Sequence, residues 1–184
     1  MALFLVRHGA TEWSESGRHT STTDLPLLPT GEEDARKLIS RLGRYDFEQV
    51  LTSPRQRARR TAELAGFPDA IVDEDLVEWD YGDYEGVTTA EIREQDPEWS
   101  IWTGVTPGGE TAAEITSRLD RVIARARALE GDMLAFAHGH CLRALAARWV
   151  DEEVSFGRFL LLGTATLSIL GDDRGQAAVV TWNS

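Results

Sequence analysis

Residues 3–9 read Leu-Phe-Leu-Val-Arg-His-Gly, and residues 133–140 read Met-Leu-Ala-Phe-Ala-His-Gly-His. Each stretch is a short apolar run of the kind that forms a buried parallel strand, and each reaches a histidine that is followed by glycine. Ligands of open α/β sheets bind beyond the carboxyl ends of the strands, where the strand order reverses. If the two strands are neighbours, His8 and His138 lie across one pocket from each other.

The glycine after each histidine lets the backbone come close to a bound ligand. A helix is expected after His138, and the amide groups at its N-terminus, beginning with Gly139, favour an anion. A single histidine is more often an ordinary core or surface residue. Because two of the chain's 4 histidines are placed alike at strand ends, they favour a shared anion-binding site.

The rest of the chain alternates between helical and strand patterns. Thr30 and Glu33 have capping-box spacing, and Ile115, Leu119 and Val122 belong to an apolar stripe typical of an amphipathic helix. Helices are predicted over 30–42, 54–65, 89–95, 98–102, 111–129 and 141–150, strands over 2–6, 49–51, 133–137, 164–170 and 177–182, a hairpin turn at 172–175 and a loop over 76–86. The alternation predicts a single α/β domain over residues 1–184, a three-layer α/β/α sandwich with a mainly parallel sheet.

The composition is that of a globular chain, with 184 residues, 42% hydrophobic residues and a formal net charge of -12. The acidic balance predicts that neither nucleic acid nor an anionic membrane is a partner, because both attract basic surfaces. No apolar run approaches the roughly 20 residues that span a bilayer, and no cationic leader precedes the first apolar stretch, so a cytoplasmic location is expected. Cys141 is the only cysteine, which excludes an intramolecular disulfide. A homodimer stays open, since no sequence feature supports one.

Two further segments carry charged groups suited to phosphate chemistry. Residues 53–62 read Ser-Pro-Arg-Gln-Arg-Ala-Arg-Arg-Thr-Ala, where Arg57 and Thr61 share one helical face. The other arginines of this segment are predicted to be solvated: Arg55, Arg59 and Arg60. Residues 76–86 place Glu78 in a loop with three aromatic residues: Trp79, Tyr81 and Tyr84. A carboxyl group that aromatic side chains desolvate can hold a proton and act as a general acid.

Four motifs occur in a fixed order along the chain. They are Arg-His-Gly at 7–9, Ser-x3-Arg-Ala-x2-Thr-Ala at 53–62, Glu-x3-Gly-x2-Glu-Gly at 78–86 and His-Gly-His at 138–140. This set resembles the histidine phosphatase (phosphoglycerate mutase-like) superfamily over nearly the whole chain. Longer strings, such as Phe-Ala-His-Gly-His-Cys-Leu-Arg, are similar to the branch of bacterial mutase-like acid phosphatases and fungal sedoheptulose-1,7-bisphosphatases.

The resemblance implies a role for each motif residue. His8 attacks phosphorus in line, while a backbone carbonyl holds its other ring nitrogen. Arg7, Arg57 and His138 surround the equatorial oxygens, and Glu78 protonates the leaving group and then deprotonates water. Secondary phosphate or substrate contacts are expected from Ser14, Thr20, Ser21, Tyr81 and Gly139. Neither a metal ion nor another cofactor is implied, and activity is expected to be best below neutral pH, where Glu78 is protonated and His8 is still neutral.

This sequence departs from the family pattern at several positions. Ser14 replaces the asparagine common in the mutases, and Ser21 replaces a glycine whose backbone approaches phosphate. The cofactor-dependent mutases also have a lysine and an arginine pair before the long helix, whereas residues 87–110 contain only Arg93. The sequence therefore favours a metal-independent phosphatase of small phosphomonoesters, with a phosphoglycerate mutase that uses the same phosphohistidine as the alternative. With few cations outside the core site, a single phosphate group is favoured on the substrate, while the resemblance keeps bisphosphorylated sugars as the alternative.

Other classes of protein fit less well. A cysteine phosphatase needs an arginine six residues after Cys141, where Ala147 stands, and a P-loop needs a lysine after glycine, which Lys37 is not. His138 and His140 could chelate a metal ion, but no further ligands stand out at matching spacings. A non-catalytic binding module is disfavoured because all five core residues are present.

Overall fold

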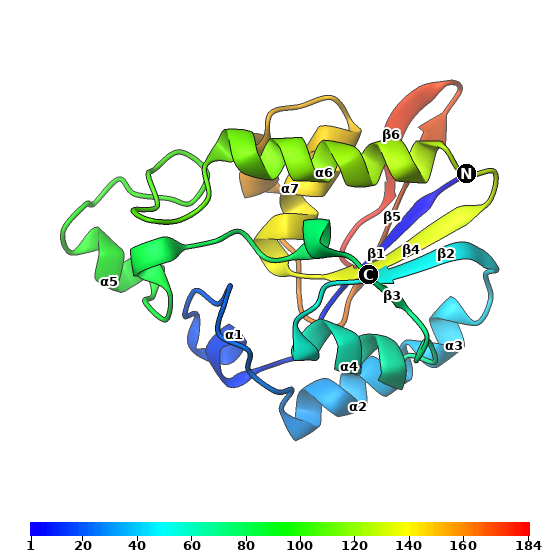
Figure 1. Cartoon of the computed structure of the whole chain (residues 1–184), viewed down its shortest axis with the longest axis horizontal. Coiled ribbons are helices and arrows are strands. Elements are labelled where there is room, and N and C mark those ends of the chain that lie inside the picture. Colours follow the sequence, from blue (N-terminus) through cyan, green and yellow to red (C-terminus); the bar gives the residue numbers. More distant parts are fainter.

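The two apolar runs form neighbouring parallel strands, β1 (Leu3–Arg7) and β4 (Asp132–Ala137), with Leu3 opposite Met133 and Arg7 opposite Ala137. A computed structural model describes all 184 residues. Its six-stranded sheet has the order β3-β2-β4-β1-β5-β6 (Figure 1). The remaining strands are β2 (Phe47–Thr52), β3 (Ile71–Val72), β5 (Leu167–Asp173) and β6 (Gln176–Thr181). The four strands β3, β2, β4 and β1 are parallel to one another. Strand β5 is antiparallel to both β1 and β6, so the sheet is mixed and mainly parallel.

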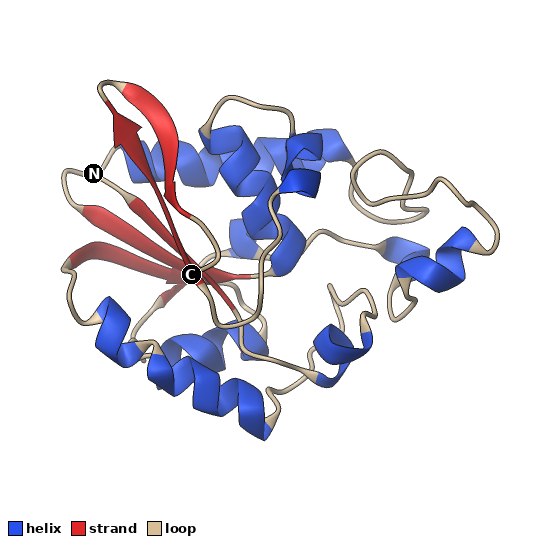
Figure 2. Ribbon diagram, turned by 180° about the vertical axis from the view of Figure 1, so that it is seen from behind, coloured by secondary structure: helices blue, strands red, loops and turns tan.

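Helices cover both faces of the sheet, which confirms the three-layer sandwich (Figures 1 and 2). One face carries α6 (Ala112–Arg127) and α7 (Gly139–Trp149), and the other carries α2 (Pro29–Lys37), α3 (Ile39–Leu42) and α4 (Gln56–Leu64). The alternation along β1 explains the two layers, because successive side chains of a strand point to opposite faces. Leu3 and Leu5 pack in the core that contains α6 and α7, whereas Phe4 and Val6 pack in the core below α4.

Local sequence signals set several helix boundaries. Helix α6 begins at a capping box in which the Thr111 and Glu114 side chains bond each other's backbone, and its apolar stripe is buried as predicted. The predicted helix over 30–42 is divided at Leu38 into α2 and α3. The short helices α1 (Glu12–Ser16) and α5 (Thr89–Arg93) flank the carboxyl edge of the sheet, and only α5 was predicted. None of the helices has the length and apolar character needed to cross a membrane.

The predicted helix over 98–102 is wrong, because these residues form turns. Trp99 is buried, and its indole N–H donates to the Val105 carbonyl 2.9 Å away, so the chain curls around the ring instead of continuing a helix. The predicted strand over 164–170 begins at Leu167, and the predicted strand over 49–51 is longer in both directions. The hairpin at 172–175 is confirmed, with Gly175 at a positive φ of 85°.

The sequence predicts that Gly9 lets the backbone come close to a ligand, but in the structure Gly9 lets it come close to another protein segment. A Cβ at Gly9 would overlap the main chain of Gly31 in the first turn of α2, and a Cβ at Gly31 would overlap the main chain of Ala10. The loop that carries the first histidine motif therefore rests on α2 with no side chain between them. At the second motif, a Cβ on Gly139 would lie 3.3 Å from the Arg7 guanidinium. Both glycines make room for protein groups.

Candidate active site

The carboxyl ends of β1 and β4 meet at a cavity of about 210 Å³. Arg7 is the last residue of β1, His8 follows it, and Gly139 opens α7; all three line the cavity. The pairing of β1 with β4 confirms that the two His-Gly segments are neighbours. Segments far apart in the sequence complete the wall, among them residues 17–20 and Glu78.

His8 is held as a neutral ring with one nitrogen free. Its Nδ1 lies 2.8 Å from the Gly9 carbonyl oxygen. Because a carbonyl can only accept, Nδ1 carries the proton and Nε2 keeps its lone pair. Burial, and then the charges of Arg7 and Arg57, lower the pKa of His8 well below its usual 6.5. The ring therefore has the protonation state of a nucleophile near neutral pH.

His138 lies beside His8, with 5.2 Å between the ring centroids. Arg57 donates from Nε to Nδ1 of His138 over 3.1 Å, so this nitrogen is unprotonated. The proton is therefore on Nε2, which lies 2.7 Å from the Ser53 hydroxyl oxygen. Burial, followed by the charge of Arg57, lowers the pKa of His138 well below 6.5, which keeps this ring neutral as well.

Arg57 and His138 are completely buried and do not line the cavity. The terminal nitrogens of Arg57 donate to the carbonyl oxygens of Thr20, Ser21 and Thr23. The resemblance implies that both residues contact phosphate oxygens. In this structure they lie outside the cavity wall, where they support His8 and the loop over 20–23.

Arg7 presents a donor at the cavity. One terminal nitrogen donates to the Leu162 carbonyl over 2.6 Å, while Nε is buried without a hydrogen-bond partner. Burial lowers the pKa of Arg7, and the charge of Glu78 opposes this effect. The Arg7 guanidinium carries its charge at the wall of the cavity, which suits it to an oxygen of a bound phosphate.

Glu78 occupies the N-terminus of α7. Its Oε1 accepts from the backbone amides of Trp79 (2.9 Å) and Cys141 (2.7 Å), and its Oε2 accepts from the amide of His140 (3.0 Å). The side chain is buried and lines the cavity. Because Oε2 receives only one N–H, it has a lone pair left for a contact with a bound molecule.

Four of the five residues expected to make secondary contacts line the cavity: Ser14, Thr20, Tyr81 and Gly139. The Ser14 hydroxyl already belongs to a capping box with Thr11 at the start of α1. The Thr20 hydroxyl donates to the Arg18 carbonyl 3.1 Å away. These hydroxyls therefore shape the wall of the cavity and already have protein partners.

Ser21 does not line the cavity. Its amide and its hydroxyl both donate to the Glu85 carboxylate, and the hydroxyl contact is 2.6 Å long. The serine that replaces the family's glycine is thus used to fasten the loop to Glu85. Tyr81 lines the cavity, and its hydroxyl lies 2.6 Å from Nδ1 of His140. Burial and the charge of Glu78 raise the pKa of Tyr81 well above 10, so the phenol is protonated.

Known proteins share the sequence pattern and the fold of this chain. A sequence-family model described as the histidine phosphatase superfamily (branch 1) matches residues 3–184. The chain belongs to this superfamily. An acid phosphatase of Mycobacterium tuberculosis (strain ATCC 25618 / H37Rv) is 41% identical, with 97% of this chain and 91% of the relative covered. A sedoheptulose 1,7-bisphosphatase of Saccharomyces cerevisiae (strain ATCC 204508 / S288c) is 42% identical, with 79% of this chain and 66% of the relative covered.

A solved structure of an open reading frame from Mycobacterium tuberculosis superposes with a TM-score of 0.96 at 39% identity, over 99% of this chain and 96% of the other. The fold is therefore that of the histidine phosphatases. Membership of the superfamily, together with relatives that are named phosphatases, makes the chain a phosphoric monoester hydrolase.

Two arginines of this histidine phosphatase line the cavity without having been predicted, Arg18 and Arg143. Arg18 follows α1 and donates to the Gly86 carbonyl. Arg143 donates to the Gly157 carbonyl, and its guanidinium lies 4.7 Å from the Trp102 ring centroid. Helical spacing could have identified Arg143, because it lies one turn after Gly139 on the same face of α7. No spacing pointed to Arg18.

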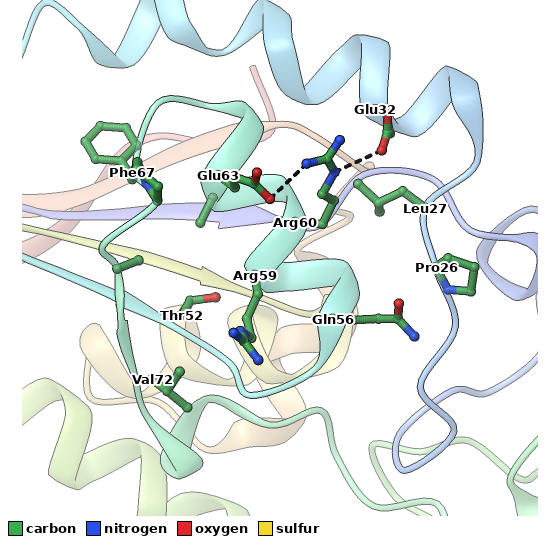
Figure 3. Close-up of a pocket in the computed structure, with 13 residues that line it drawn as sticks. Pro26, Leu27, Glu32, Thr52, Gln56, Arg59, Arg60, Glu63, Phe67 and Val72 are labelled. Carbon is green, nitrogen blue, oxygen red and sulfur yellow. Dashed lines mark hydrogen bonds and ion pairs between the residues drawn. The ribbon is translucent and has the colours of Figure 1, made fainter.

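A larger hollow of about 650 Å³ lies beside α4, and residues of α2, β2 and β3 also line it (Figure 3). No imidazole lines it, and Arg60 is paired there with Glu32 and Glu63. Arg59 points into this hollow, and the structure thus separates it from Arg57, on the buried side of the same helix. The smaller cavity, which His8 and Glu78 line, is therefore the candidate active site.

The chelating pair considered from the sequence does not form. His138 uses both ring nitrogens for Arg57 and Ser53, and Nδ1 of His140 is bonded to Tyr81. Burial and the charge of Arg143 lower the pKa of His140 well below 6.5. No three His, Cys, Asp or Glu side chains gather in a group that could hold a metal ion.

Proposed function

We propose that this phosphatase hydrolyses small phosphomonoesters, such as sugar phosphates, through a phosphohistidine at His8 and without a metal ion. The proposal depends above all on one observation, the neutral His8 ring whose Nδ1 is bonded to the Gly9 carbonyl. That bond leaves Nε2 as the nucleophile, in a cavity that Arg7 also lines. The residues of one domain, 1–184, would supply all the groups required.

The reaction proceeds in two steps. Nε2 of His8 forms a bond to phosphorus while the bond from phosphorus to the ester oxygen breaks, and Glu78 gives its proton to the departing alkoxide. Glu78 then takes a proton from water as that water attacks the phosphohistidine, which releases phosphate and restores both residues. Arg7 balances the charge of the transferred group. Arg57 holds the loop over residues 20–23 through its carbonyl groups, and the His138 ring packs beside His8.

The test is to trap the phosphoenzyme. Rapid quenching of the wild-type enzyme with a labelled ester should give a phosphoprotein that is stable to alkali and labile to acid. His8→Ala should abolish both this species and turnover, with a chelator present throughout. Glu78→Gln should still form the phosphoenzyme from an aryl phosphate, because an acidic phenol leaves without help. Turnover by His8→Ala would overturn the proposal.

The cavity also favours a substrate with a second anionic group. Arg18 and Arg143 line it in addition to Arg7, whereas the sequence led us to expect a single phosphate. The yeast relative named sedoheptulose 1,7-bisphosphatase supports a phosphorylated sugar of this kind. Phosphate release should be compared across sugar monophosphates, sugar bisphosphates and an aryl phosphate. Equal kcat/KM values for mono- and bisphosphates would contradict this assignment.

Mutase activity is the second candidate function. It requires further cations that retain a bisphosphate, and the Nε of Arg93, the one basic residue of 87–110, bonds the Trp99 carbonyl instead. Neither Arg93 nor Trp99 lines the cavity. We therefore expect hydrolysis to exceed phosphoglycerate isomerisation when 2,3-bisphosphoglycerate is supplied.

We further propose a cytoplasmic enzyme that binds neither nucleic acid nor membranes, on the basis of its net charge of -12. A homodimer would form through the edge strand β3, where Ile71 is 56% exposed and Val72 is 48% exposed. An unpaired edge strand is a template for pairing with a second copy. Light scattering of the wild type beside Ile71→Lys tests this, since a dimer should become a monomer.

A further inference from the structure

The segment that carries Glu78 is fastened to α6 by a row of arginines. Arg118, Arg121 and Arg125 lie three and four residues apart, so they share one face of the helix. Arg121 pairs with the carboxylate of Asp75, and Arg125 pairs with that of Asp73. Both of these arginines are substantially exposed, which limits the energy of their ion pairs.

Arg118 differs from its neighbours because it is buried. It forms a bidentate pair with Glu110, over 2.6 Å from Nε and 2.8 Å from a terminal nitrogen. The exposed fractions of the two side chains are only 8% and 14%. Burial lowers the pKa of Arg118, but the hydrogen bonds to Glu110 outweigh this and raise it, so the charge is permanent.

The Arg118 side chain and the Glu110 backbone hold the chain on the two sides of Glu78. Before Glu78, a terminal nitrogen of Arg118 donates to the Asp75 carbonyl over 2.7 Å. After Glu78, the Glu110 backbone accepts from the Trp79 indole over 2.8 Å and donates to the Asp80 carbonyl over 3.0 Å. The loop is therefore clamped within three residues of the carboxyl group in either direction.

Arg118 also contacts α7, the helix whose N-terminal amides bind the Glu78 carboxylate. A terminal nitrogen of Arg118 lies 3.8 Å from Sγ of Cys141, and the Cys141 amide donates to Glu78. We propose that Arg118, paired with Glu110, is a positioning residue that holds the Glu78 carboxyl group in line with the leaving-group oxygen. This inference rests on the proposed acid–base role of Glu78.

The experiment compares two esters. A 4-nitrophenyl ester needs little protonation of its leaving group, whereas an alkyl phosphate needs a general acid. The ratio of kcat/KM values for the two esters therefore reports the alignment of Glu78. Because Arg118→Met alone leaves the Glu110 charge buried and unpaired, the main variant is Arg118→Met with Glu110→Gln, and circular dichroism checks its folding. Arg118→Lys tests rescue by a retained charge.

The matched control removes a different ion pair between α6 and α7. Arg148 pairs with Asp120 over 3.0 Å and does not touch the Glu78 segment. Arg148→Met with Asp120→Asn should leave the aryl-to-alkyl ratio within about twofold of the wild type. The Arg118–Glu110 variant should raise the ratio by about tenfold, a fraction of the 10²–10⁴ that a general acid supplies. Arg118→Lys should give an intermediate value.

Glu78→Gln separates the two proposals. It should raise the aryl-to-alkyl ratio strongly, and adding the Arg118–Glu110 change to it should raise the ratio no further. If Glu78→Gln leaves the ratio unchanged, the acid–base role fails and this inference fails with it. If Glu78→Gln raises the ratio but the folded Arg118–Glu110 variant does not, only the positioning role is overturned.

Discussion

The Ser53 hydroxyl oxygen lies 2.7 Å from Nε2 of His138, whose Nδ1 receives the N–H of Arg57. The two contacts together fix which nitrogen of this buried ring carries the proton. Ser53 itself is completely buried. A residue outside the cavity thus determines the state of the imidazole that packs against the nucleophile.

Ser53→Ala should destabilise the protein, because it leaves the Nε2–H of His138 buried without an acceptor. Such a group costs about 1–3 kcal/mol. Urea unfolding at neutral pH should show a loss of that size. Ser40→Ala is the control, since its exposed hydroxyl bonds only the Lys37 carbonyl. A Ser53→Ala protein as stable as the wild type would show that the tautomer is held by other groups.

Stability should fall as the pH decreases below about 6.5. Burial is the main cause that lowers the pKa of all four histidines, to about 4 for His19 and well below 6.5 for His8, His138 and His140. The unfolded chain therefore binds more protons, and each histidine costs about 1.4 kcal/mol per pH unit below the unfolded pKa. Unfolding free energies measured between pH 7 and pH 5 should show this slope, and His19→Gln should reduce it by about one proton.

Arg143→Met should discriminate between substrates. Arg143 lines the cavity and would hold the second anionic group, so its loss should raise KM for a bisphosphorylated sugar by about tenfold, the size of one charge-assisted contact. The KM for 4-nitrophenyl phosphate should change little. An equal effect on both substrates would show that Arg143 acts on the reacting phosphate itself.

Glu85→Gln should loosen the loop over 20–23. The Glu85 carboxylate desolvates on folding, yet hydrogen bonds from Ser21 and Thr23 lower its pKa below the usual value. An amide cannot accept at both of its ends, so one donor loses its partner at a cost of about 1–3 kcal/mol. Because Arg57 donates to carbonyls of the same loop, kcat/KM should fall as well. If Glu85→Gln lowers the stability but leaves the activity unchanged, the loop over 20–23 does not contribute to catalysis.

Cys141 should be inert in the folded enzyme. The thiol is fully buried, and burial raises its pKa to about 12. Incubation with iodoacetamide should leave the activity intact, and mass spectrometry should find labelling only after denaturation. Rapid labelling of the active enzyme would mean that α7 opens in solution.

Local sequence patterns predicted the central elements of this structure. The apolar runs before His8 and His138 predicted β1 and β4, and the stripe from Ile115 predicted α6, because one residue type recurs at one period. Strand β3 escaped prediction since its two residues show no period. The turns at 98–102 depend on where the Trp99 ring is buried, which is a tertiary property.

The candidate site was predictable only in part. Motif order indicated the residues around His8, but not that Arg57 and His138 lie outside the cavity wall. The partners that place them there, Ser53 and the carbonyls of 20–23, come from segments with no mutual spacing in the sequence. The hydrogen bond from Ser21 to Glu85 was not predicted either, because these two residues also come from distant segments.

The acceptor that orients the His8 ring is the carbonyl of Gly9, a main-chain atom. Every amino acid supplies that atom, so no single replacement of a neighbouring side chain can delete it. The tautomer of the first imidazole is thus insulated from mutational drift, whereas that of His138 depends on a serine and an arginine. A single substitution at position 53 or 57 can therefore change which nitrogen of the second ring is protonated, while the first ring keeps its acceptor.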